Sequence, residues 1–170
     1  MIPISLDPLI AEARQDLDTL RAAGDDPDPA LAYLLDDLYR IGLAIEREPS
    51  HRVSPDLRRF IDDSAAVFYD RSTALLFQPN LIVQRFRDTW IDDEWRQLCA
   101  ARSGLQFLID LYPNTLIDDF LPLLEADYVD DFIRRQGHEG HLYDNEIPRS
   151  IPQSHWWWWY PEPPRPGASG

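Results

Sequence analysis

Three proline-containing segments set the strongest limit on what this chain can fold into. Asp7-Pro8, Asp28-Pro29 and Ser54-Pro55 each place a helix-capping residue directly before a proline. Proline is well tolerated in the first turn of a helix, where its missing N–H has no intrahelical partner. Apolar residues at a spacing of three or four follow each pair, which is the pattern of a helix with one buried face. The first part of the chain therefore predicts amphipathic helices.

The same spacing continues to about residue 135, and alternation typical of strands is nearly absent. A short segment over 80–87 adds a turn or two, a long helix is expected from about 89 to 111, and Pro122 should kink or split the last one. The sequence predicts an all-α fold, a bundle of five to six helices over residues 1–136. The predicted inward residues are Leu9, Ala13, Leu17, Leu20, Leu31, Leu34, Leu38, Ile41, Ile45, Leu57, Ile61, Ala65, Phe68, Ile91, Trp95, Leu98, Leu105, Leu108, Tyr112, Ile117, Leu121, Leu124, Tyr128 and Phe132.

The character of the chain changes at Gly137, after which prolines are frequent and four tryptophans stand in a row. We expect residues 137–170 to form an extended, partly polyproline-like tail that packs on the bundle, with about the last eight residues mobile. Four tryptophans left in water would invite aggregation. Trp157 and Trp158 therefore serve either as part of a strap that covers a helix face or as an anchor for a partner, and the sequence leaves both readings open.

The formal net charge is -14, and all 16 basic residues are arginine. Such a chain repels phosphate groups, so neither direct nucleic-acid binding nor binding to anionic membranes is expected. No apolar run of about 18 residues is present, and the first residues lack the pattern of a secretory signal. The one cysteine, Cys99, permits no internal disulfide. We therefore expect a cytoplasmic protein.

Acidic residues gather in two blocks, residues 1–50 and 104–146. In the first block and in the middle of the chain, most paired aspartates have an arginine four residues away or open a helix, so their roles are explained locally. In the late block, five acids have no arginine three or four residues away, whereas the next two have Arg134 and Arg135. This surface is either simply solvated or complementary to a basic partner. The candidate partner-binding residues are Asp110, Asp118, Asp119, Glu125, Asp127, Asp130, Asp131, Trp157 and Trp158.

Motifs for catalysis are missing from the sequence. Neither a Glu-x-x-His pair nor an Asp-Asp-x-x-Asp run occurs, and His138 and His141 stand in a glycine-containing turn with few further ligands available. No nucleophile with an evident base and no phosphate-binding loop is present. We therefore expect no metal, no cofactor and no enzymatic activity.

A small acidic helical chain that ends in SHWWWWYPEPP resembles bacterial toxin-immunity proteins, the neutralising partners of contact-dependent and polymorphic toxins. The resemblance implies stoichiometric binding to a basic toxin domain, often a nuclease, and it assigns no role to any individual residue. The alternatives are a nucleic-acid mimic or a chaperone for a basic protein, a subunit that buries its tryptophans in a homo-oligomer and, less favoured, a small helical enzyme.

Overall fold

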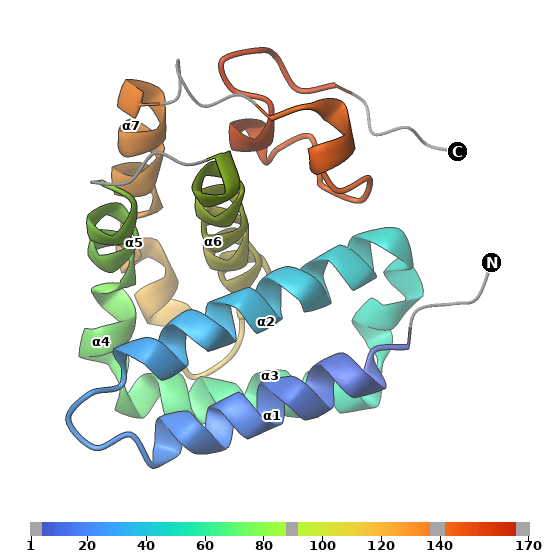
Figure 1. The fold of residues 1–170 in the computed structure, drawn as a ribbon. Helices are drawn as coiled ribbons and strands as arrows, with labels where there is room; N and C mark the ends of the chain where they lie inside the picture. Colours follow the sequence, from blue (N-terminus) through green and yellow to red (C-terminus); the bar gives the residue numbers. More distant parts are fainter. Residues whose placement is uncertain (1–4, 88–91, 137–141, 166–170) are drawn as a thin grey trace.

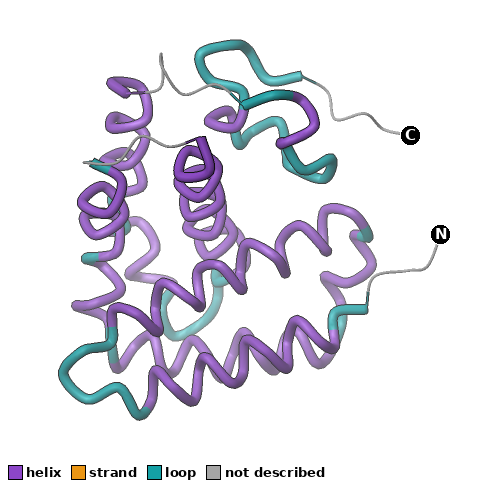
Figure 2. The backbone as a smooth tube through the Cα atoms, in the orientation of Figure 1, coloured by secondary structure: helices purple, strands orange, loops and turns teal. Residues whose placement is uncertain are grey.

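The computed structural model describes residues 5–87, 92–136 and 142–165. Within those ranges the chain forms seven α-helices and four short 3₁₀ helices, and no strand occurs there (Figures 1 and 2). The elements are α1 (Asp7–Arg21), α2 (Asp28–Arg47), η1 (Pro49–Val53), α3 (Pro55–Asp70), α4 (Ser72–Leu76), α5 (Gln78–Phe86), α6 (Asp92–Leu111), η2 (Asp118–Leu123), α7 (Ala126–Gln136), η3 (Asp144–Glu146) and η4 (Trp156–Trp158).

Helices α1, α2 and α3 pack side by side through their apolar stripes, and α6 crosses α2 (Figure 1). Two glycines permit this close crossing. A Cβ at Gly42 of α2 would collide with the ring of Phe107, and a Cβ at Gly104 of α6 would collide with the carbonyl of Leu35. The absence of these two side chains lets the backbones approach, so α6 lies against the middle of α2.

The predicted all-α bundle is confirmed. The helix count is higher than the expected five to six because α3 ends at Asp70 and a separate short helix, α4, follows it; α5 corresponds to the short segment expected over 80–87. Pro79 lies in the first turn of α5, where a proline starts a new helix and cannot continue the preceding one. Pro122 likewise confines residues 118–123 to a 3₁₀ turn before α7 begins, which is the split expected from the sequence.

The predicted inward residues form one continuous core. Leu9 and Tyr128 are only partly buried, and Ile91 lies outside the described residues. Ser54 caps α3 as its position before Pro55 suggests, because its Oγ accepts a hydrogen bond from the Leu57 amide at 3.4 Å. In α1 and α2 the helix begins one residue earlier than expected, so Asp7 and Asp28 lie in the first turn.

The C-terminal segment packs on the bundle, as expected, but its backbone is not extended around the tryptophans. Residues 142–165 include two 3₁₀ turns, and Trp157, Trp158 and Trp159 are all buried in the same core as the helices. In a strand, neighbouring side chains point to opposite faces, so a run of buried rings requires the coiled geometry seen in η4. Residues 166–170, most of the stretch expected to be mobile, lie outside the described part of the chain, as do His138 and His141.

Across the described residues, no helix combines the length and the apolar character needed to cross a membrane.

Candidate partner-binding surface and the buried anchor beside it

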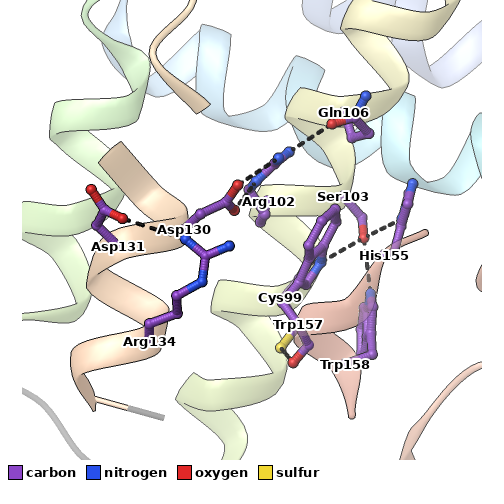
Figure 3. A network of polar contacts seen from close by, with 10 residues as sticks. All are labelled: Cys99, Arg102, Ser103, Gln106, Asp130, Asp131, Arg134, His155, Trp157 and Trp158. Carbon is purple, nitrogen blue, oxygen red and sulfur yellow. Dashed lines mark hydrogen bonds and ion pairs between the residues drawn. The ribbon is translucent and has the colours of Figure 1, made fainter. Parts of the chain in front are cut away.

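The tryptophan segment is fixed to α6 through the hydroxyl of Ser103, which is fully buried (Figure 3). The indole Nε1 atoms of Trp157 and Trp158 donate to Ser103 Oγ at 3.1 and 2.9 Å. Ser103 Oγ also lies 2.9 Å from His155 Nδ1. Because the oxygen already accepts two hydrogen bonds, its own proton points to Nδ1, and His155 is the neutral tautomer with its proton on Nε2. Every hydrogen-bonding position of Ser103 is thereby used.

Two further groups hold Trp157 in place. Its Nε1 also donates to the Cys99 carbonyl at 3.1 Å, and the Cys99 Sγ donates to the Trp157 carbonyl at 3.5 Å. The guanidinium of Arg102 lies over the indole ring, with 4.3 Å from Cζ to the ring centroid. One turn of α6 thus contacts the indole on its edge and its face, and the indole N–H and the carbonyl of Trp157 both have hydrogen-bond partners.

Arg102 joins this anchor to α7. Its Nε and Nη2 atoms donate to the two carboxylate oxygens of Asp130 at 2.7 and 3.3 Å, and both side chains are more than nine-tenths buried. Its Nη1 donates to Gln106 Oε1 at 3.2 Å. A two-point contact between a guanidinium and a carboxylate is the geometry that best offsets the loss of hydration for both charges. The pair ties α6, α7 and Trp157 into one unit.

The imidazole of His155 lies between aromatic rings in this anchor. Its ring is stacked on Trp157 at a centroid distance of 4.7 Å and lies 4.9 Å from the ring of Phe107. Burial, assisted by the positive charge of Arg102, lowers the pKa of His155 from 6.5 to about 4. The histidine is therefore neutral near pH 7. Ser103 is fully buried and bonded to two indoles, so this serine–histidine pair is not accessible from the protein surface. It positions the C-terminal segment.

Three of the nine predicted site residues lie in this interior. Asp130 is 6% exposed and paired with Arg102, not with the neighbouring Arg134 that the sequence suggested, so it is not part of an acidic surface. It faces inward because it lies beside Val129 and one turn from Ile133 on the buried side of α7. Trp157 and Trp158 are 2% and 1% exposed, which places both in the core and leaves neither ring available on the surface.

The other predicted acids lie on the surface. Asp131 pairs with Arg134 at 3.4 Å, and the carboxylate of Asp110 accepts a hydrogen bond from Gln106 at 3.0 Å. We use "η2 segment" for residues 116–127, which contain the remaining four acids. All four are exposed, and none forms an ion pair with another described residue: Asp118, Asp119, Glu125 and Asp127.

Two large apolar side chains are exposed in the same segment. Leu116 and Leu123 are 62% and 57% exposed, and the ring of Phe120 contacts the exposed ring of Tyr69 at a centroid distance of 5.7 Å. The η2 segment therefore combines unpaired carboxylates with exposed apolar surface. This combination is typical of a surface that another molecule covers.

Several acids in the first half of the chain differ from those of the η2 segment because arginines bond them, in two cases from another helix. Arg14 of α1 bonds Asp63 of α3 at 3.1 Å, and Arg40 of α2 bonds Glu12 of α1 at 2.8 Å. Arg40 also bonds Asp37 at 2.7 Å. Burial, a hydrogen bond that the protonated Asp37 donates to Asp16 and the nearby negative charges together raise the pKa of Asp37 to about 8. Among these acids, Glu12 and Asp63 connect helices to one another.

Sequence reasoning missed Arg102, Ser103 and His155 as members of the anchor. One signal for the first two was present. Arg102 stands four residues after Leu98 and three before Leu105, so it lies on the buried stripe of α6, and Ser103 follows Cys99 by four. A charged residue on a buried stripe requires a buried partner. Nothing in the spacing identifies that partner as Asp130.

Among the residues that the structure describes, no group of three or more His, Cys, Asp or Glu side chains is arranged to hold a metal ion. The anchor itself uses its one histidine to accept a hydrogen bond from serine.

Comparison with known proteins gives a local similarity. A stretch of 63 residues is 30% identical to a 3-hydroxyanthranilate 3,4-dioxygenase of Burkholderia lata, covering 37% of this chain and 36% of that enzyme. The match thus spans about a third of that curated relative. No family model matches the chain, and no solved structure matches it either. The similarity is confined to a segment and assigns no family to the protein.

Proposed function

We propose that this protein binds a basic partner protein and neutralises it without catalysis, as a toxin-immunity protein does for its cognate toxin in the cytoplasm of the producing cell. The observation that carries the proposal is the η2 segment, where four exposed carboxylates without an ion-pair partner among the described residues accompany two exposed leucines. Carboxylates of this kind attract a cationic surface over a distance of about 10 Å at moderate ionic strength.

The rigid core supports such a role. The anchor around Ser103 and the pair between Arg102 and Asp130 hold α6 and α7 together, and the η2 segment lies between these two helices in the chain. A surface on a rigid support loses little conformational freedom when a partner binds. The exposed leucines then contribute apolar contact area, while the carboxylates direct the approach of a basic protein and speed its association.

The test compares two triple variants that remove the same charge. Asp118→Asn, Asp119→Asn and Asp127→Asn alter the η2 segment. Asp18→Asn, Asp56→Asn and Asp62→Asn alter exposed acids that are paired with arginines in the structure. Each tagged protein is used to capture partners from lysate of the source cell at low ionic strength, and the captured partner is then purified and its association rate measured against salt concentration.

We expect one basic protein at one-to-one stoichiometry with the wild type and with the second triple variant. The η2 variant should associate at least about tenfold more slowly, with a weaker dependence on salt. Equal association by the two variants would contradict a role for the η2 segment. Capture of many nucleic-acid-binding proteins, displaced by added DNA, would instead favour a nucleic-acid mimic.

A further inference from the structure

A second candidate site lies away from the η2 segment. A cavity of about 830 Å³ opens between the N-terminal part of α2, helix α5 and helix α6. These three helices are neighbours in the bundle (Figure 1). Cavities of about 300–1,000 Å³ bury most of the surface of a small organic ligand, so this one has the capacity for such a molecule.

The walls of the cavity separate into apolar and acidic parts. Tyr33 of α2, Leu81 of α5 and Ala101 of α6 supply accessible apolar surface. The acidic part comes from Asp26 just before α2, Asp28 in its first turn and Asp36 about two turns further along it. A ligand that fills this space therefore meets apolar contacts along one part and negative charge at another.

The balance of charge favours a cation. Arg85 also lines the cavity, and its guanidinium lies 5.8 Å from the centroid of the neighbouring Phe86 ring. The N-terminus of α2 adds roughly half a positive charge. Three carboxylates outweigh these two contributions. Neither Asp26 nor Asp28 forms an ion pair with another described residue, and Asp36 reaches only the Nε of Arg40, at 3.4 Å.

The pKa of Asp36 also favours a positively charged ligand. Partial burial and the negative charges of Glu12 and Asp16 raise the pKa of this carboxyl group, although its side chain is 56% exposed. A positive group placed in the cavity would favour the ionised carboxylate.

From this geometry we propose that the cavity between α2, α5 and α6 binds a small organic cation, an ammonium or guanidinium group carried on an apolar body. The apolar body contacts Tyr33, Leu81 and Ala101, and the cation faces Asp26, Asp28 and Asp36. The site is separate from the η2 segment and does not depend on the function proposed for that segment.

The experiment uses three probes with one apolar body and different charges: 4-phenylbutylguanidinium, 4-phenylbutanol and 4-phenylbutanoate. Each is titrated into the isotopically labelled full chain at physiological ionic strength, and backbone amide shifts are followed by NMR. We expect the guanidinium to shift amides of α2, α5 and α6 around the cavity and to bind at least about tenfold more tightly than the alcohol, with the carboxylate weakest.

Two double variants remove equal charge at different places. Asp26→Asn with Asp36→Asn should weaken the guanidinium about tenfold and leave the alcohol unchanged. Asp118→Asn with Asp119→Asn serves as the matched control and should leave all three probes unchanged. Equal binding of the guanidinium and the alcohol to the wild type, an equal loss in both variants, or shifts spread over the other acidic surfaces would each overturn the proposal. None of these results bears on the binding of a basic protein by the η2 segment.

Discussion

The buried anchor and the η2 segment, which lies between α6 and α7 in the chain, differ in how their charged side chains are placed. In the anchor, Arg102 and Asp130 are more than nine-tenths buried and bond each other at two points. In the η2 segment, Asp118 and Asp119 are exposed and form no ion pair with another described residue. Carboxylates of the same type thus hold the fold together in one region and remain available to a partner in the other.

Adjacent residues of α7 show what decides between these roles. Asp130 points into the core and Asp131 points to solvent, because neighbouring positions of a helix are separated by about 100° around its axis. The local sequence offers both of them an arginine four residues on, yet Asp130 bonds Arg102 on another helix. Position on the helix, and not the nearest opposite charge in sequence, determines which role an acid takes.

The largest expected effect on stability is a difference between substitutions at Asp130 and at Asp131. Asp130→Asn leaves the guanidinium of Arg102 buried without a counter-charge, and the free energy of unfolding should fall by about 3–5 kcal/mol. Asp131→Asn removes the same charge from an exposed pair with Arg134, at a cost of less than about 1 kcal/mol. Urea denaturation of both variants near pH 7 measures the difference. Similar losses in the two variants would mean that the anchor is not distinguished by its burial.

A pH dependence should also originate in the anchor. Since the pKa of His155 falls from 6.5 in the unfolded chain to about 4 in the folded protein, the unfolded state binds more protons between these values. The histidine's contribution to stability is complete above pH 6.5 and is lost as the pH falls through 4. The full change is on the order of 3 kcal/mol.

Comparison with His155→Asn isolates this effect from the titration of carboxylates. Asparagine retains an acceptor for the hydroxyl of Ser103 and does not titrate in this range. Denaturation midpoints measured from pH 7 to pH 4 should therefore fall more steeply for the wild type than for the variant. Parallel curves would show that His155 is not held in its neutral form.

Removal of the Ser103 hydroxyl should lower the free energy of unfolding by about 2 kcal/mol. Ser103→Ala removes the acceptor shared by two buried indoles, and although Trp157 keeps its bond to the Cys99 carbonyl, the Nε1 of Trp158 loses its partner. Ser154→Ala, at an exposed position in the same segment, is the control and should change stability by less than about 0.5 kcal/mol. Thermal melts of the two variants, together with tryptophan fluorescence, test the contrast. If Ser103→Ala left the melting temperature unchanged, packing alone would hold the two indole rings in place.

Much of the helical fold could be predicted from the sequence, because helices depend on local features such as the position of prolines and the spacing of apolar residues. The proline positions predicted where α2 and α3 begin to within a residue, and nearly all of the residues that the stripes assigned to the core are buried. The anchor could not be predicted in the same way, because Ser103, Asp130 and His155 meet through tertiary packing of segments far apart in the chain. The coiled backbone of the tryptophan run was also missed, since repeated identical residues carry no periodicity.

The smallest expected effect on stability is in the η2 segment, and its sign distinguishes that segment from the anchor. Asp118→Asn with Asp119→Asn removes two neighbouring carboxylates that repel each other, so stability should rise slightly, by less than about 0.5 kcal/mol at low ionic strength. The gain should vanish near 1 M salt, where charges are screened beyond about 3 Å. Both acids lie in the first turn of η2, but that helix has six residues, so a favourable dipole interaction offsets little of the repulsion. Urea denaturation at the two ionic strengths measures the change. A clear loss of stability would show that these two carboxylates support the fold as Asp130 does and are not free to bind a partner.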